Sequence, residues 1–397
     1  MMRRVVKKVF AGDEMRVGIV AVAQTAFDVH RALRPQELTY LAVKKCLEIC
    51  GLPFRDGYED IVTCSSDHWD GKTLSDVEHG EVAGAHLGPG EVKVSMDGAN
   101  AVILGAIKIL SGHAKCVLVT ACCKESQVLD PSIIENFGFD APYQQLIGLD
   151  FTQAAGLQAV AYMNRYGLSH KDFAQIAVTE RRRAKGNPRL LAREDLSLEQ
   201  VMESRMLAYP ITVLESRVPC DGACAMVLAC EERAKELTDR PVWIKGFGSC
   251  YDHHNLGDRD LSQPFALKKA SFQAYEMAGI KDPAKEIQIF ELSEHYSYQL
   301  PLWMEGIGVC REGKGVEVLG GGGQSALDSD AFNPSGGLLG GVPRYVAGAS
   351  RVIEAFLQLR GEAEGVQVPG EPQLALAHGT HGPAGQHHCV LILERGF

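Results

Sequence analysis

The order of strand-like and helical stretches in this sequence repeats once, and this repetition restricts the possible folds more than any other feature. The first half reads strand, helix, strand, small-residue helix and strand over 16–24, 38–52, 60–66, 94–113 and 115–123. The second half repeats this order over 242–250, 267–280, 287–297, 333–361 and 387–396. The first helices begin at residues 38 and 267, and Gly98 and Gly336 have nearly the same separation. The pattern predicts an α/β protein with a duplicated βα unit and a largely parallel sheet, with chance similarity as the alternative.

One long stretch, residues 125–215, does not fit the repeat. It contains helical sequence followed by a polar, basic segment, so we expect an inserted loop domain. The remaining chain divides into an N-terminal half at 15–235, which includes this insertion, and a C-terminal half at 236–397. Residues 1–14 are expected to form a solvated tail, because their apolar run is too short for a secretory signal.

Charge and cysteine usage exclude several classes of protein. A net charge of −10 argues against a nucleic-acid-binding protein, which would usually show a basic face. No apolar run reaches the length of about 18 residues that a membrane span needs. The twelve cysteines include no Cys-x-x-Cys pair and lie mostly in apolar surroundings. They predict reduced, buried thiols in a cytoplasmic protein rather than a zinc site or disulfides.

Five sequence motifs together resemble those of the thiolase superfamily. They are RRRAKGNPRLLA, VPCDGACAMVLA, FELSEHYS, NPSGG and EAFLQLRGEA, and the match extends over nearly the whole chain from Met15. Within the superfamily the sequence is similar to thiolases related to sterol carrier protein and lipid-transfer proteins. The resemblance implies a five-layer αβαβα thiolase fold and the making or breaking of a carbon–carbon bond beside a coenzyme A thioester. It implies coenzyme A as part of the substrate and no tightly bound cofactor.

The nucleophile that the resemblance implies is absent from its usual position. Thiolases place a cysteine at the start of a buried helix, where the helix dipole lowers the thiol pKa. Aligned on Val94, this position falls on Gly98, which cannot carry an acyl group. We therefore expect no covalent acyl-enzyme there. A thiolase that uses another cysteine is an alternative, with Cys123, Cys64 or Cys122 as candidates.

The other catalytic positions implied by the resemblance are also changed. The family histidine falls on Ser293, the Gly-His-Pro motif reads GGVPRY, and the second cysteine position falls on His378. Carboxylate, imidazole and phenol groups nearby are the usual proton-transfer groups. The candidates, expected on two loops over the helix that starts at Gly98, are Glu294, His295, Tyr296, His378 and His381.

Two readings of these substitutions stay open. The first is a rebuilt acid–base site without covalent catalysis, like the family members that are retro-aldolases of β-hydroxyacyl-CoA. The second is a non-catalytic subunit of a larger thiolase or acyltransferase complex, in which these polar residues are only hydrogen-bonded or solvated.

Two further segments are candidates for substrate contact. The basic run Arg181, Arg182, Arg183 and Lys185 could bind the phosphates of coenzyme A or form a solvated helix face. The polar and aromatic segment 64–76 could line a pocket or be an ordinary loop. Neither segment, nor any other, predicts a metal site.

The resemblance also implies partners. Thiolases of this family are intertwined dimers, and the apolar strand 115–123 lies in a sheet whose edge needs cover. We expect a homodimer or a heterodimer with a related thiolase. A small zinc-ribbon/OB-fold subunit is a further partner implied by the resemblance. Nucleic acid and membrane are not expected as partners.

Overall fold

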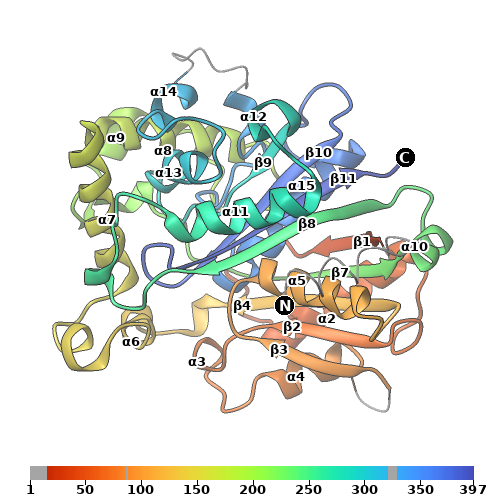
Figure 1. Ribbon diagram of the computed structural model, residues 1–397. Helices are drawn as coiled ribbons and strands as arrows, with labels where there is room; N and C mark the ends of the chain where they lie inside the picture. The colour runs from red at the N-terminus through yellow and green to blue at the C-terminus, as the bar shows by residue number, and fades with distance from the viewer. Residues whose placement is uncertain (1–15, 86–87, 321–328) are drawn as a thin grey trace.

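The computed structural model describes residues 16–85, 88–320 and 329–397 (Figure 1), so the expected tail at 1–14 lies outside the described residues. Nine strands form one mixed sheet in the order β3-β2-β4-β7-β1-β8-β11-β10-β9. They are β1 (Val17–Gln24), β2 (Asp60–Cys64), β3 (Gly90–Val94), β4 (Cys116–Lys124), β7 (Asp221–Cys230), β8 (Val242–Tyr251), β9 (Ile289–Glu291), β10 (Leu374–His381) and β11 (His387–Arg395). A separate ribbon pairs β5 (Met206–Ala208) with β6 (Ile211–Thr212).

The strand directions differ from the expected largely parallel sheet. Only β2–β3, β2–β4 and β9–β10 are parallel among the pairs of the nine-stranded sheet. The pairs β1–β7, β1–β8, β4–β7, β8–β11 and β10–β11 are antiparallel. The expectation fails at two places: β7 enters between β1 and β4 from the opposite end of the sheet, and β8 and β11 are each antiparallel to both of their neighbours.

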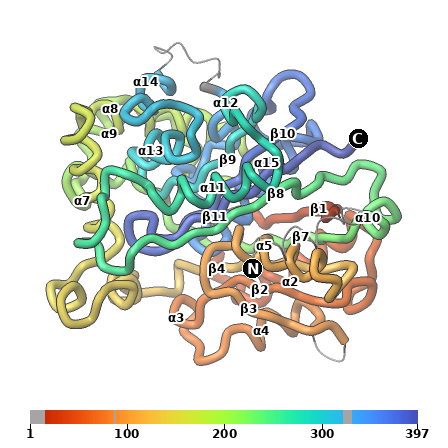
Figure 2. Tube along the Cα trace, in the orientation of Figure 1, coloured from red at the N-terminus to blue at the C-terminus, as the bar shows by residue number. Residues whose placement is uncertain are grey.

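Three sets of helices cover the strands and form the expected αβαβα layers. Helices α2 (Pro35–Cys50) and α10 (Glu231–Leu237) pack on the first-half strands, and α11 (Phe265–Ala278) packs on β8 and β11. Helices α5 (Gly98–Leu110) and α15 (Ala347–Arg360) pack against each other and contact strands of both halves. Figure 2 shows the first-half strands on one side of β8 and β9–β11 on the other. The thiolase-like α/β fold is thus confirmed.

The remaining helices connect these layers. The chain between β4 and β7 forms α6 (Pro131–Asn136), α7 (Phe151–Tyr166), α8 (His170–Ala184) and α9 (Leu198–Glu203). Shorter helices are α3 (Asp67–Asp70), α4 (Asp76–Val82), α12 (Pro283–Glu286), α13 (Gln299–Gly306) and α14 (Gly315–Leu319). Residues of α7 and α8 share an apolar cluster with α11 and α13, which anchors them to the second half. The expected boundary between residues 235 and 236 falls within α10. No helix in the described ranges has both the length and the apolar character to cross a bilayer.

One carboxylate joins the two middle helices. Asp97 caps α5 by accepting the N–H of Ala99 at 2.9 Å, and it accepts the N–H of Gly348 in α15 at 2.9 Å. Burial raises the pKa of Asp97 to about 7. A Cβ on Gly348 would lie 1.8 Å from Oδ1 of Asp97, and one on Gly379 would lie 2.0 Å from it. Only glycine fits at these two positions.

Two details of the expected second half are corrected by the structure. The small-residue helix begins at Ala347, because Asn333, Gly336 and Gly337 have positive φ angles that a helix does not allow. Gly336 therefore lies in a turn and does not correspond to Gly98, the first residue of α5. The expected glycine-rich loop around His378 is largely strand β10.

Candidate functional site

A cavity of about 680 Å³ lies where α6 and α7 meet the carboxyl ends of β4 and β10. Its walls also include the segment that follows β9, parts of the segment 205–219 with strands β5 and β6, and Arg344. Ligand sites in α/β proteins commonly form beyond the carboxyl ends of strands. This cavity is therefore the candidate functional site.

Two imidazoles face this cavity from different segments. His295 follows β9 and His381 is the last residue of β10, and both are partly exposed. Neither ring makes a hydrogen bond to any residue in the described parts of the chain. Burial and the nearby charge of Arg344 lower the pKa of His381 to about 4. Burial, with Arg217 next in importance, also lowers the pKa of His295 well below its usual range. Both rings are neutral at pH 7, so each has a nitrogen lone pair that can accept a proton.

Tyr296 adds a protonated hydroxyl beside the imidazoles. Its hydroxyl lies 3.1 Å from Oγ1 of Thr152, the second residue of α7. Burial raises its pKa to about 12, so the phenol stays protonated at neutral pH and can donate. Gln299, which also lines the cavity, accepts the N–H of His295 at 2.9 Å and holds this segment in place.

Two ion pairs fix positive charge in the cavity wall. Arg217 binds both oxygens of Glu125 at 2.7 and 2.8 Å, and Arg344 binds Glu135 at 2.5 Å. The N–H of Arg344 also donates to Glu125 at 2.8 Å. The guanidinium of Arg344 lies 4.7 Å from the centroid of the Trp69 ring. Cations held this rigidly can stabilise negative charge that develops on a bound substrate.

The expected site residue Glu294 lies behind the cavity wall, not in it. Its buried carboxylate accepts the N–H of Leu338 at 2.5 Å and an amide N–H of Asn333 at 2.7 Å. Burial, followed by the charge of Glu180, raises its pKa well above the usual range. Glu294 therefore holds the turn before α15.

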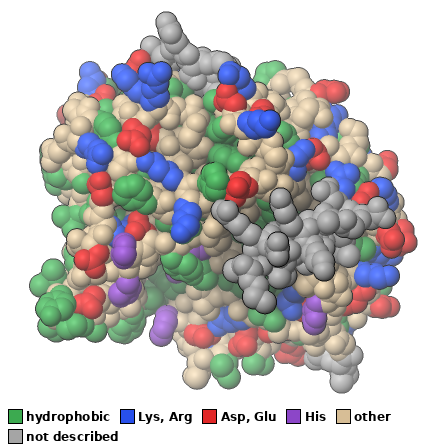
Figure 3. Space-filling model, viewed as in Figure 1, with side chains coloured by type: hydrophobic (Ala, Val, Ile, Leu, Met, Phe, Trp, Pro, Cys, Tyr) green, Lys and Arg blue, Asp and Glu red, His purple; other side chains and the backbone are tan. Residues whose placement is uncertain are grey.

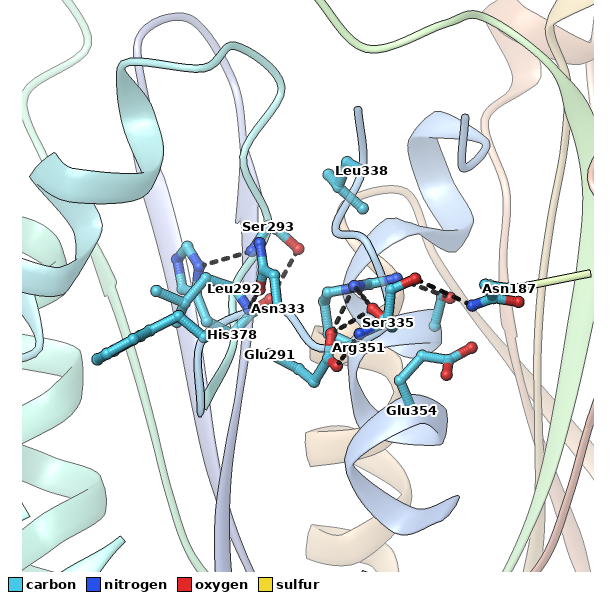
Figure 4. Close-up of polar contacts among 12 residues, drawn as sticks. Asn187, Glu291, Leu292, Ser293, Asn333, Ser335, Leu338, Arg351, Glu354 and His378 are labelled. Atoms are coloured by element: carbon cyan, nitrogen blue, oxygen red, sulfur yellow. Dashed lines mark hydrogen bonds and ion pairs between the residues drawn. The ribbon is translucent and has the colours of Figure 1, made fainter. Parts of the chain in front are cut away.

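His378 also lies behind the wall, fully buried. Its Nδ1 accepts the N–H of Ser293 at 3.2 Å (Figure 4), and its Nε2 lies 2.8 Å from Nδ1 of His388. Burial lowers its pKa to about 3. Of the five residues expected to form the site, the cavity thus brings together His295, Tyr296 and His381 and leaves out Glu294 and His378.

The position of Gly98 is closed by packing. A Cβ on Gly98 would lie 2.6 Å from Cβ of Ala349 and 2.9 Å from the carbonyl oxygen of Tyr345, and Gly98 does not line the cavity. Its assignment to the nucleophile position remains a prediction from the sequence pattern. None of the described residues that line the cavity is a cysteine. The three alternative thiols are buried, and burial raises the pKa of each: Cys64, Cys122 and Cys123.

The basic run is divided between the interior and the surface. Arg181 and Arg183 are buried, and Arg183 donates to Glu180 at 2.9 Å. Arg182 and Lys185 are exposed, and Lys185 pairs with Asp195. None of the four lines the cavity, so their binding to coenzyme A remains a prediction.

The segment 64–76 does not line the cavity either. Trp69 supports Arg344 from behind, and the ring of His68 lies 5.7 Å from that of Phe137. Within the described residues, no group of three or more His, Cys, Asp or Glu could hold a metal ion.

The sequence pattern did not indicate Arg217, Arg344 or Thr152 as site residues. Arg217 and Arg344 lie far in sequence from the carboxylates that they bind. A signal for Arg344 was present in GGVPRY, where a basic residue follows the altered Gly-His-Pro motif.

Comparisons with known proteins agree with this fold. Residues 248–395 match the family model "Thiolase C-terminal domain-like". The chain is 30% identical over 296 residues to an acetyl-CoA acetyltransferase of Methanothermobacter thermautotrophicus, covering 73% of this chain and 76% of that protein. It is 29% identical over 331 residues to sterol carrier protein 2 of Oryctolagus cuniculus, covering 76% of this chain but only 57% of that protein.

A solved structure is similar over almost the whole chain. The "Ltp2-ChsH2(DUF35) aldolase" superposes with a TM-score of 0.80 at 22% identity, covering 96% of this chain and 98% of that one. This likeness concerns the fold. The resemblance read from the motifs is thus confirmed, and the chain belongs to the thiolase family, whose substrates are carried on coenzyme A.

Proposed function

We propose that this chain is an enzyme that forms or cleaves a carbon–carbon bond of an acyl-CoA by acid–base chemistry, without a covalent cysteine intermediate. One observation carries this proposal: the cavity presents two neutral imidazoles, a protonated phenol and two guanidinium groups, each paired with a carboxylate, and no cysteine among its described lining residues. These groups suit an aldol reaction better than a thiolase reaction, which needs a thiolate. The similar solved structure is named an aldolase, which supports the choice of an aldol reaction.

In the cleavage direction the reaction would use a β-hydroxyacyl-CoA. An imidazole of His295 or His381 takes the proton of the β-hydroxyl, and the oxygen forms a carbonyl as the bond between Cα and Cβ breaks. The electron pair of that bond moves to the thioester as an enolate. The charges of Arg217 and Arg344 lower the energy of this enolate, and Tyr296 donates a hydrogen bond to it. Protonation at Cα by the imidazolium then releases the shortened acyl-CoA.

Site variants assayed with β-hydroxyacyl-CoA esters test this proposal. A panel of such esters is incubated with the full chain, and the carbonyl product is quantified. His295→Gln and His381→Gln should each lower turnover by about 10²- to 10⁴-fold, the usual value of one acid–base group. His253→Gln is the matched control, because His253 is exposed and does not line the cavity. Unchanged turnover in both cavity variants would overturn the proposal.

We also propose that the chain works with a partner subunit, either as a dimer with itself or a related thiolase, or with a small zinc-ribbon/OB-fold protein. Figure 3 shows hydrophobic side chains gathered at the corner that α6 and the following turn form. Those most exposed there are Leu129, Phe137, Tyr143, Leu146 and Ile147. Exposed apolar patches of this kind commonly mark protein contacts. Strand β3 is also at the edge of the sheet, with Val92 39% exposed.

The alternative, a non-catalytic subunit of a larger thiolase or acyltransferase complex, would use the same exposed corner as its contact surface. Analytical ultracentrifugation of the native chain and of the L146S/I147S variant tests the dimer of the chain with itself, and a monomer in both cases would contradict that dimer. A reduced compartment such as the cytoplasm is proposed because all twelve cysteines are free thiols.

A further inference from the structure

The backbone just before the cavity residues is held at three points. The N–H of Ser293 donates to Nδ1 of His378 at 3.2 Å, and the hydroxyl of Ser293 donates to the carbonyl oxygen of His378 at 2.7 Å. The indole N–H of Trp303 donates to the carbonyl oxygen of Ser293 at 3.0 Å. Figure 4 shows Ser293 and His378 joined in this way. Glu294, His295 and Tyr296 follow Ser293 in that order, so the position of the two cavity residues depends on these contacts.

The direction of these hydrogen bonds determines where the imidazole protons are. A backbone N–H can only donate, so Nδ1 of His378 is unprotonated and the proton of the neutral ring is on Nε2. That Nε2–H donates to Nδ1 of His388 at 2.8 Å. The proton of His388 is then on its Nε2. We refer to His378 and His388 as the imidazole pair.

Both rings of the imidazole pair are kept neutral. They are fully buried, with centroids 5.1 Å apart. Burial is the main cause that lowers the pKa of both; His387 lowers the pKa of His378 further, and His378, His387 and Arg259 do so for His388, against a smaller opposite effect of the Gly385 backbone. The rings of Trp303 and His388 pack edge to face, with their centroids 4.8 Å apart. Neither member can hold a second proton near pH 7.

The far end of the pair lies against the opposite wall of the cavity. Nε2 of His388 is buried, without a hydrogen bond of normal geometry to a described residue, and lies beside the backbone of Gly385. A Cβ on Gly385 would lie 2.9 Å from this nitrogen. Gly385 and Ala384 line the cavity, and Arg259 donates to the carbonyl oxygen of Ala384 at 2.6 Å. The pair therefore connects the segment with His295 and Tyr296 to the turn that follows His381.

We propose that His378 and His388 are positioning residues, whose fixed tautomers set the spacing between the two cavity walls. They do not conduct protons, because one end of the pair is a backbone N–H that cannot accept one. An apolar ring in place of His378 would leave the Ser293 N–H buried without an acceptor, which is unfavourable. The catalytic role of the cavity residues that are positioned rests on the proposed function, whereas the assignment of the two tautomers does not.

Nitrogen NMR of the ¹⁵N-histidine-labelled full chain tests the tautomers directly. The expected spectrum shows both His378 and His388 as neutral Nε2–H tautomers with no titration between about pH 5 and 8. An Nδ1–H tautomer or a protonated His378 at pH 7 would overturn the proposal. This result is independent of any turnover, so it remains decisive even if the proposed function fails.

Two variants test positioning against mere packing. His388→Asn retains an acceptor oxygen near the place of Nδ1, whereas His388→Leu fills a similar volume without one. We expect the imidazole signals of His295 and His381 to stay within wild-type line widths in H388N and to shift or broaden in H388L. If H388L leaves both signals unchanged, or H388N disturbs them equally, the pair does not position the cavity walls. If H388L does not fold, the tautomers of the wild-type chain and the spectrum of H388N still test the proposal.

Discussion

The ring of His381 packs against the ring of Tyr345, with centroids 5.8 Å apart, and the backbone of Tyr345 in turn covers Gly98. The expected nucleophile position and the cavity are therefore on opposite sides of one tyrosine. Chemistry in this cavity therefore depends on side chains that lie on the cavity side of Tyr345, and not on the position of Gly98.

The packing at Gly98 predicts the effect of adding a side chain there. Gly98→Ala should destabilise the chain by about 1–3 kcal/mol, because its Cβ would overlap Ala349 and Tyr345. Urea denaturation measures the change. Gly257→Ala is the control, because its Cβ would meet only Asn255 at 3.4 Å. Equal stability of the two variants would show that α15 yields easily at this point.

The buried ion pair in the cavity wall predicts a large effect of removing one partner. Glu125→Gln leaves the charge of Arg217 buried without its carboxylate, and should lower the free energy of unfolding by about 3–5 kcal/mol. Glu236→Gln, in the exposed pair with Arg233, should change it by less than about 1 kcal/mol. Thermal or urea unfolding compares the two. A similar small loss in both would mean that the Glu125 pair is solvated.

The buried Glu354 predicts how stability depends on pH. Burial, followed by the charge of Glu291, raises its pKa to about 7, above its usual 4.5. The folded state thus holds this proton more tightly, so stability falls as pH rises from about 4.5 to 7 and then levels off. Glu354→Gln should therefore reduce the loss of unfolding free energy over this pH range by about 3 kcal/mol.

Asp97 has the same direction of shift, so the E354Q variant should reduce the pH dependence without abolishing it. Glu371→Gln, in an exposed salt bridge, is the control and should leave the pH dependence unchanged. Urea unfolding at pH 5 and pH 7.5 measures the difference. If the unfolding free energy of E354Q changes between the two pH values as much as that of the wild-type chain, the pKa of Glu354 is not raised.

The cavity imidazoles predict an unusual pH profile of activity. Because the pKa of His381 is about 4, kcat/KM should stay constant from about pH 8 to 5.5 and fall only below that. Arg344→Gln should move the inflection to higher pH by removing a nearby positive charge, and Arg344→Lys should not. An inflection near pH 6.5, that of an ordinary histidine, would contradict the site geometry.

The strands that carry long apolar runs could be predicted from the sequence. The expected stretches at 16–24 and 242–250 coincide with β1 and β8 to within one residue at each end. The glycine beside His378 favours a loop, whereas the structure has strand β10 there, and Gly379 is required by Asp97, which approaches from a distant segment. A contact between residues so far apart in sequence leaves no local pattern.

The same error explains why His378 does not lie in the cavity as expected. Side chains alternate along a strand, so His378 and His381, three residues apart in β10, point to opposite faces. His381 faces the cavity and His378 faces the core. A loop, in which side chains do not alternate regularly, would not have placed the two histidines on opposite faces. The pairing of Arg217 and Arg344 with their carboxylates depends on the topology and could not be read from the sequence.

The central claim is that carbon–carbon chemistry occurs here without an acyl-enzyme. Intact-protein mass spectrometry of samples quenched during turnover of a β-hydroxyacyl-CoA tests it most directly. We predict that carbonyl product accumulates while the mass of the chain stays that of the free protein. An acyl adduct that forms and decays at the rate of turnover, mapped to Cys64, Cys122 or Cys123, would contradict the claim and restore a thiolase mechanism.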